Sequence, residues 1–96
     1  MYKILFTRNY KKSEEQFIKK NPSLKETIKK TLLLLSENPY YNSLKSHKVL
    51  SKRHGPTISS WVTGDIRILW MFDSKIQLQI LAIDLGKHSG AQKIYK

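Results

Sequence analysis

The chain has 96 residues, of which 40% are hydrophobic, so it is long enough for one domain with a modest core and too apolar for wholesale disorder. It contains 18 lysines and arginines against 7 acidic residues and no cysteine, which excludes disulfides and thiolate zinc sites. No apolar run approaches a membrane span and the start lacks a signal peptide's apolar core, so we predict a single cytoplasmic domain over residues 1–96 with no membrane partner.

The chain begins with a short apolar run over residues 2–7 that is typical of a strand. Ser13 and Gln16 have the spacing of a capping box, in which two side chains satisfy the first backbone N–H groups of a helix. This box predicts a helix over about residues 14–20, which Asn21-Pro22 interrupts.

A second capping box, Ser23 with Glu26, predicts another helix that ends at Asn38-Pro39. Apolar residues recur along it at helical spacing: Leu24, Ile28, Leu32 and Leu35. The break before it is tight, so we expect the two helices to run antiparallel.

The second half of the chain changes to the period of strands. Turn signals at Gly55-Pro56, at residues 63–65 and at Asp73-Ser74 separate the apolar runs. The predicted strands cover residues 47–50, 57–62, 66–72 and 75–84. Because strands follow one another after the helices, we predict an α+β fold in which the N-terminal strand and a helical hairpin pack on one face of a small antiparallel sheet.

Side chains alternate between the two faces of a strand, which places the polar residues of the last two strands. The face expected to meet the helices carries Ile66, Ile68, Trp70 and Phe72 in one strand and Ile76, Leu78, Ile80 and Ala82 in the other. Arg67 then lies on the open face, where it meets an anion or forms a salt bridge with Asp84 or Asp65.

Charge is the strongest signal of function. The net charge is +11, and such an excess favours a polyanion or an acidic protein as partner. Residues 38–64 contain no acid, but they include Lys45, Lys48, Lys52, Arg53, His47 and His54. This stretch predicts a nucleic-acid surface, with a merely solvated basic face as the alternative.

Histidines and aromatic residues could add chemistry to this surface. His88 follows a predicted buried strand, where rigid structure can aim a proton-transfer group. The three histidines do not have the spacing of a zinc site, so we predict no metal and no cofactor. Both tryptophans are typical of a core, although Trp61 could stack on a base because its strand adjoins the basic stretch.

An arginine with histidines on a basic sheet face suits RNA cleavage without a metal. The 2′-hydroxyl must lose a proton to attack phosphorus, the leaving 5′-oxygen must gain one, and the phosphate between them needs positive charge. DNA lacks the attacking hydroxyl, so this chemistry selects RNA.

Three segments, taken in order, resemble the RelE/ParE toxin superfamily, and within it the YafQ-like branch of RelE-like mRNA interferases. The segments are NSLKSHKV, VTGDIRILW and LAIDLGKHSGAQKIYK. They are similar to the family's LKtHkL segment, its dyRiiy strand and its diG.Hd.vY ending. The resemblance covers essentially the whole chain and implies the RelE-like microbial RNase fold.

The resemblance also implies roles for particular residues. His88 matches a general acid/base, Arg67 the arginine that contacts the scissile phosphate, and His47 a histidine used by some members. Tyr95 matches a terminal aromatic near the cleaved nucleotide, although residues 89–94 make the tail longer than the family pattern. The RNA-gripping residues would be Lys45, Lys48, Lys52, Arg53 and Lys87.

The partners implied are a cognate antitoxin, small and acidic, together with mRNA and the ribosome. The function implied is that of a type II toxin–antitoxin toxin that cleaves mRNA as an endoribonuclease. Two alternatives stay open: a ParE-like toxin that inhibits DNA gyrase by binding, and a basic RNA-binding module without toxicity.

Overall fold

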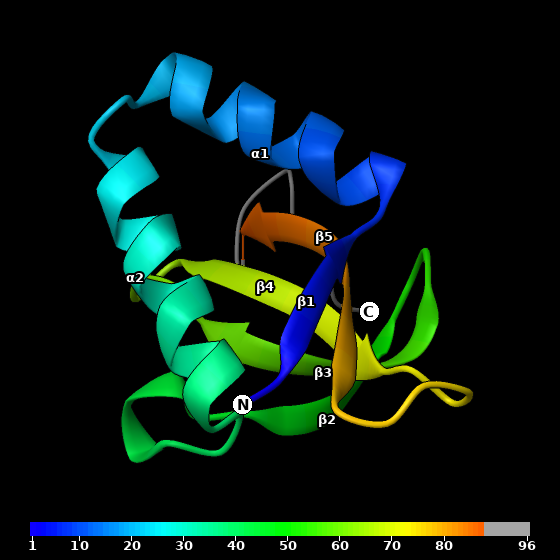
Figure 1. Ribbon diagram of the computed structural model, residues 1–96. Coiled ribbons are helices and arrows are strands. Elements are labelled where there is room, and N and C mark those ends of the chain that lie inside the picture. Colours follow the sequence, from blue (N-terminus) through cyan, green and yellow to red (C-terminus); the bar gives the residue numbers. More distant parts are fainter. Residues whose placement is uncertain (88–96) are drawn as a thin grey trace.

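The computed structural model describes residues 1–87, and their arrangement confirms the predicted α+β class (Figure 1). Two helices pack against a five-stranded sheet, and a short 3₁₀ helix, η1, connects the two parts. The elements in chain order are β1 (Lys3–Phe6), α1 (Arg8–Lys20), α2 (Leu24–Glu37), η1 (Asn42–Leu44), β2 (His47–Ser51), β3 (Gly55–Trp61), β4 (Ile66–Phe72) and β5 (Gln79–Lys87).

The sheet has the strand order β1-β5-β4-β3-β2 and is mixed. Strands β2 to β5 pair antiparallel with their neighbours, whereas β1 pairs parallel with β5. The prediction of an antiparallel sheet is therefore wrong at β1. The chain leaves β1 through the helices and returns beside it only in β5, and a parallel pair requires such a long connection.

Helix α1 begins at Arg8, earlier than the capping-box pattern predicted. Thr7 is its N-cap, and the Thr7 hydroxyl accepts a hydrogen bond from the backbone N–H of Tyr10 at 3.1 Å. Ser13, the predicted cap, lies inside the helix and uses its hydroxyl in a contact with the sheet. A capping side chain belongs where the backbone leaves the helix, and here that place is Thr7.

Helix α2 begins at Leu24, as predicted, but its cap differs. Ser23 makes no capping bond and instead donates its hydroxyl hydrogen to Asn21 Oδ1 at 2.7 Å. The helices splay apart instead of packing antiparallel, because α1 packs mainly along β5 (Figure 1). Within residues 1–87 there is no helix that could serve as an apolar transmembrane span.

The core lies between the helices and one face of the sheet, and it confirms the predicted face of β4 for Ile66, Ile68 and Trp70. Phe72, predicted on the same core face, is 37% exposed. The buried members of the core are Tyr10, Leu24, Ile28, Leu35, Leu44, Ile66, Ile68, Trp70, Ile80, Ala82 and Leu85. Tyr10 also donates its hydroxyl hydrogen to Glu14 Oε2 at 2.7 Å. Burial is the main reason why the pKa of Tyr10 lies far above its ordinary value, and the hydrogen bond to Glu14 raises the pKa further. The phenol therefore stays protonated.

Strand β5 begins later than predicted, at Gln79. Ile76 and Leu78, expected in the core, are 53% and 58% exposed. The Asp73 carboxylate explains this, because it accepts hydrogen bonds from the backbone N–H groups of Lys75 and Ile76 and folds the segment into a loop. The bond from Lys75 is the main reason why the pKa of Asp73 lies below its usual value.

A chain of hydroxyl contacts ties the loop after α2 to the sheet. The indole Nε1 of Trp70 donates to Ser60 Oγ at 2.8 Å, and Ser60 Oγ lies 2.6 Å from Ser46 Oγ. Ser46 donates in turn to the carbonyl oxygen of Pro39 at 2.5 Å. Ser46 precedes β2, so this network fixes the entry to the basic stretch.

Thr57 provides a test of the packing on β3. Its Oγ1 is buried and has no hydrogen-bond partner among residues 1–87. Thr57→Val removes this unsatisfied group and keeps the shape, so it is expected to raise the free energy of unfolding by about 1 kcal/mol. A thermal melt should show a rise of roughly 4–8 °C.

The matched control for this substitution is Thr31→Val in α2. Thr31 is also buried, but its hydroxyl donates to the carbonyl oxygen of Thr27 at 2.9 Å. The control should therefore not stabilise the protein. Equal shifts for the two variants would contradict the assignment of Thr57 as an unsatisfied group.

Candidate nucleic-acid interface

Among residues 1–87, one face of the sheet carries no helix, and this helix-free face gathers the polar residues of interest. Residues paired across antiparallel strands share a face, so the register defines rows across the sheet. One row runs from β2 to β5 as His47, Ser59, Leu69 and Asp84. The next row contains Trp61, Arg67 and Gly86. The candidate site is built from these two rows.

Arg67 lies on this face as predicted, but the expectation that it is open to solvent is wrong. Arg67 is 3% exposed. Its Nη1 donates to the carbonyl oxygens of Thr63 at 2.8 Å and of Ile66 at 3.3 Å. The guanidinium also lies over the indole of Trp61, with 4.2 Å between Cζ and the ring centroid. Within residues 1–87, the guanidinium thus contacts the β3–β4 turn and the neighbouring strand, whereas the sequence pattern assigned this charge to water or to an anion.

Lys45 approaches the same indole from the surface. It is exposed, and its Nζ lies 5.3 Å from the centroid of the Trp61 ring. It caps η1 in the left-handed region, with φ 48° and ψ 43°. This conformation costs a residue with a side chain roughly 1–2 kcal/mol, so the surrounding contacts hold it there.

His47 begins β2 and is exposed. Its Nδ1 lies 2.8 Å from the carbonyl oxygen of Lys45. A carbonyl can only accept, so Nδ1 carries the hydrogen and the neutral ring has its lone pair on Nε2. The side chain thus offers a proton acceptor of fixed orientation at the edge of the face.

A buried carboxylate on this face was missed as a site residue. Asp84, 5% exposed, accepts hydrogen bonds from Ser13 Oγ at 2.7 Å, from the backbone N–H of Leu85 at 2.8 Å and from His54 Nε2 at 2.8 Å. These bonds join α1, β5 and the β2–β3 hairpin at one point. Asp84 therefore pairs with His54, and not with Arg67 as one alternative had it.

The other predicted RNA-binding residues are all exposed, but the structure divides them between the two faces. Lys52 and Arg53 lie in the β2–β3 hairpin, directly before the tethered His54. Lys48 pairs with Ile58, which packs against the core, so Lys48 points to the helix side. Only Lys45 and the hairpin residues are thus available to the helix-free face.

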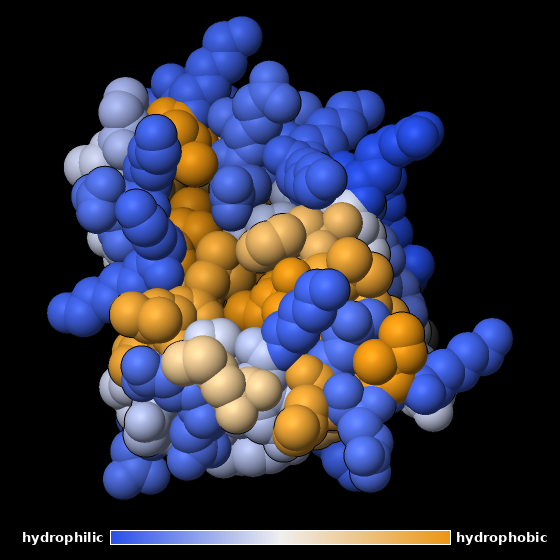
Figure 2. Space-filling view, in the orientation of Figure 1, coloured by the Kyte–Doolittle hydropathy of each residue, from blue (hydrophilic) through white to orange (hydrophobic). Residues whose placement is uncertain are grey.

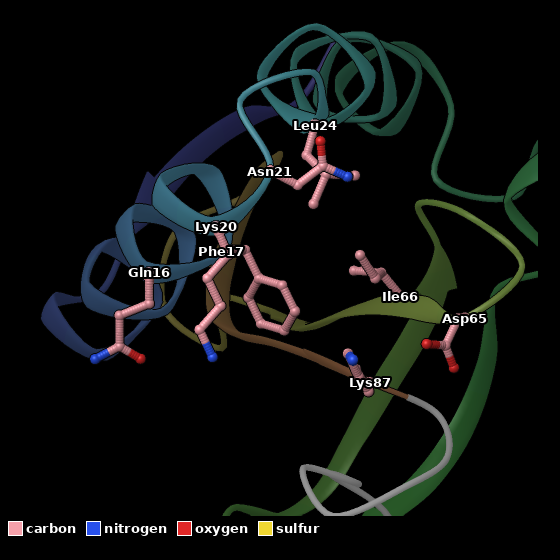
Figure 3. Close-up of a pocket in the computed structure, with 8 residues that line it drawn as sticks. All are labelled: Gln16, Phe17, Lys20, Asn21, Leu24, Asp65, Ile66 and Lys87. Atoms are coloured by element: carbon pink, nitrogen blue, oxygen red, sulfur yellow. The ribbon is translucent and has the colours of Figure 1, made fainter.

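Lys87 also belongs to the helix side, where it lines a pocket of about 340 Å³ (Figure 3). The pocket lies below the turn between the helices, and Lys20 and Lys87 flank its apolar wall, as the close-up shows. Its remaining lining residues are Gln16, Phe17, Asn21, Leu24, Asp65 and Ile66. The described residues that line this pocket include no member of the row of His47.

A second hollow of about 530 Å³ lies between β1 and α2. Figure 2 shows the apolar surface that gathers in this trough, with hydrophilic side chains along its margin. Its apolar lining consists of Ile4, Leu32 and Leu33, and its charged residues are Glu26, Lys29 and Lys30. Leu33 is 55% exposed, which leaves an apolar surface uncovered.

Two predicted site residues, His88 and Tyr95, lie outside the described residues. Strand β5 ends at Lys87, directly before His88 in the sequence. Within residues 1–87, no three carboxylate or imidazole side chains lie together so that they could hold a metal ion.

The sequence matches no family model and no curated protein. The fold, however, is similar to those of solved structures that include bacterial toxins. The YoeB/ParE toxin from Agrobacterium tumefaciens superposes with a TM-score of 0.68 at 15% identity, over 91% of this chain and 99% of that chain. YafQ from E. coli strain BL21(DE3) gives 0.67 at 17% identity, over 91% and 93%. A copper-bound mutant toxin from Helicobacter pylori gives 0.67 at 15% identity, over 92% and 96%.

Proposed function

We propose that this protein is the toxin of a type II toxin–antitoxin system and that it cleaves mRNA on the ribosome as a metal-independent endoribonuclease. The observation that carries the proposal is the exposed, oriented imidazole of His47 beside a cationic and aromatic surface, in a fold shared with toxins. The net charge of +11 favours a polyanionic substrate.

Two histidines supply the proton transfers of this reaction. The Nε2 atom of His47 accepts the proton of the 2′-hydroxyl, the O2′–P bond forms and the P–O5′ bond breaks. The leaving O5′ takes its proton from His88, which the resemblance identifies as a general acid/base. Lys45 neutralises the phosphate from the surface, and Arg67 adds positive charge to the site from its buried position without contacting the RNA.

The proposal requires an antitoxin as partner. The trough between β1 and α2 has an apolar lining, and two lysines, Lys29 and Lys30, outnumber one carboxylate, Glu26, beside it. An acidic amphipathic segment is complementary to such a surface, because its apolar side chains bury Leu33 while its carboxylates meet the lysines.

The test is cleavage of a reporter mRNA in a translating bacterial extract. Wild-type protein should produce fragments with 5′-hydroxyl and 2′,3′-cyclic phosphate ends, because the 2′-oxygen is the nucleophile. His47→Ala should slow cleavage by about 10²-fold or more, and His47→Ala with His88→Ala should leave the mRNA intact. Lys25→Met, a loss of charge on α2, is the control and should cleave normally. Fragments with 5′-phosphate ends would rule out this chemistry.

A second candidate function is inhibition of DNA gyrase by binding, as in ParE-like toxins. The burial of Arg67 favours it, because no guanidinium of β4 is then offered to a phosphate. A DNA supercoiling assay separates the two functions. If the protein blocks supercoiling and leaves the mRNA intact, its function is gyrase binding and the nuclease proposal is wrong.

A further inference from the structure

Trp61 stands apart from the core. It is half-buried, lies on the helix-free face and is absent from the cluster of core residues and their packed neighbours. The other tryptophan, Trp70, is completely buried in that core. A large aromatic ring that neither joins the core nor is fully covered is available for contact with a ligand.

Arg67 supports the Trp61 ring from within the protein. Its guanidinium is anchored by the carbonyl oxygens of Thr63 and Ile66 and lies 4.2 Å from the ring centroid. A planar guanidinium stacks on an indole, and this one is held in place by its hydrogen bonds. The guanidinium therefore supports the indole rigidly from inside the protein. The part of the indole that the protein does not cover is accessible to a ligand.

Lys45, whose own side chain is exposed, adds a second cation near this ring. Its ammonium lies 5.3 Å from the ring centroid, and its backbone is held in the left-handed region. Strained backbone of this kind is retained at functional sites when it aims a side chain. The arrangement is an aromatic surface with a surface cation beside it, in the row next to that of His47.

We propose that Trp61 is a stacking platform for one nucleobase of single-stranded RNA and that Lys45 binds the phosphate next to that base. The inference rests on the proposed function in taking RNA as the ligand. Every base has a π-face, so stacking on the indole is tolerant of sequence, while the ammonium binds the backbone. Arg67 is then a positioning residue, because it acts through Trp61 and does not touch the RNA.

The experiment is a binding titration with a 2′-O-methyl oligoribonucleotide, which lacks the attacking hydroxyl and cannot be cleaved. Stacking should quench the fluorescence of Trp61, while Trp70, buried at 0% exposure, supplies a constant background. An abasic backbone of the same length and charge is the matched ligand. It should bind roughly 5- to 100-fold more weakly, because stacking of one base contributes that much.

Variants separate stacking from charge. Trp61→Leu should bind the base-bearing and abasic ligands equally, and Trp61→Phe should restore most of the difference. Lys45→Met should weaken both ligands more than Lys25→Met does, because the control removes the same charge from α2. A thermal melt checks that each variant is folded.

The outcomes of these experiments separate a failure of the Trp61 platform from a failure of the proposed nuclease function. RNA binding that neither quenches Trp61 nor weakens in Trp61→Leu would overturn the platform and leave the nuclease proposal standing. Quenching by an acidic peptide but not by RNA would assign the same surface to a protein partner. No binding of RNA together with intact mRNA in the translating extract would overturn both.

Discussion

Replacing Asp84 by alanine is expected to lower the free energy of unfolding by about 3–5 kcal/mol, since hydrogen bonds to charged groups contribute about 1.5–3 kcal/mol each. The carboxylate accepts from Ser13, His54 and the backbone of Leu85, and it is 5% exposed. Its loss leaves buried donors without a partner and detaches the hairpin from β5. Urea unfolding measures the change.

His54→Ala is the comparison for this variant. It removes only one of the bonds to Asp84 and keeps those from Ser13 and Leu85, so we expect a loss of about 1–2 kcal/mol. Hydrogen exchange should show faster opening of residues 51–55 in both variants, with α1 affected only in Asp84→Ala. A loss below 1 kcal/mol for Asp84→Ala would mean that the carboxylate does not join the three elements.

Arg67 gives the second large effect. Arg67→Ala should destabilise the protein by about 2–4 kcal/mol, because it leaves the Thr63 carbonyl without its donor and removes the support of Trp61. The Ile66 carbonyl still accepts from the backbone N–H groups of Val62 and Thr63. Urea unfolding and the fluorescence maximum of Trp61 report the two consequences separately.

Arg67→Lys decides between a supporting and a phosphate-binding arginine. Lysine keeps the charge but has no planar fork, so it cannot donate to both carbonyls and stack on the indole. We expect a loss of about 1–2 kcal/mol together with a shift of Trp61 emission. If Arg67→Lys instead kept full stability and lost only cleavage, the arginine would contact the scissile phosphate directly.

The periodic patterns of the sequence predicted much of the fold. Apolar spacing identified α2 and the core face of β4, because Ile66, Ile68 and Trp70 share one side of a strand wherever that strand lies. Local patterns failed where a contact from a distant segment decided the outcome. Ser13 and Gln16 have the spacing of a cap, but Ser13 donates to Asp84 across the fold.

The candidate site was predicted in part. The exposed His47 and Lys45, and the placement of Arg67 opposite the core, follow from charge and alternation. The burial of Arg67 beside Trp61 and the β3–β4 turn does not follow from these patterns. Alternation specifies the face on which a side chain lies and not the groups that contact it there. The roles given to His88 and Tyr95 stay predictions.

What the sequence by itself determined is the class of fold, the single core and the cationic character of the surface, because these depend on composition and period. Tertiary structure alone decided which charges meet. Strand register brought Arg67 under Trp61 and placed Lys48 away from His47, and the folded hairpin brought His54 to Asp84. The physical reason is that side-chain partners separated by 30 residues, as in the pair of His54 and Asp84, are set by chain geometry that no local pattern encodes.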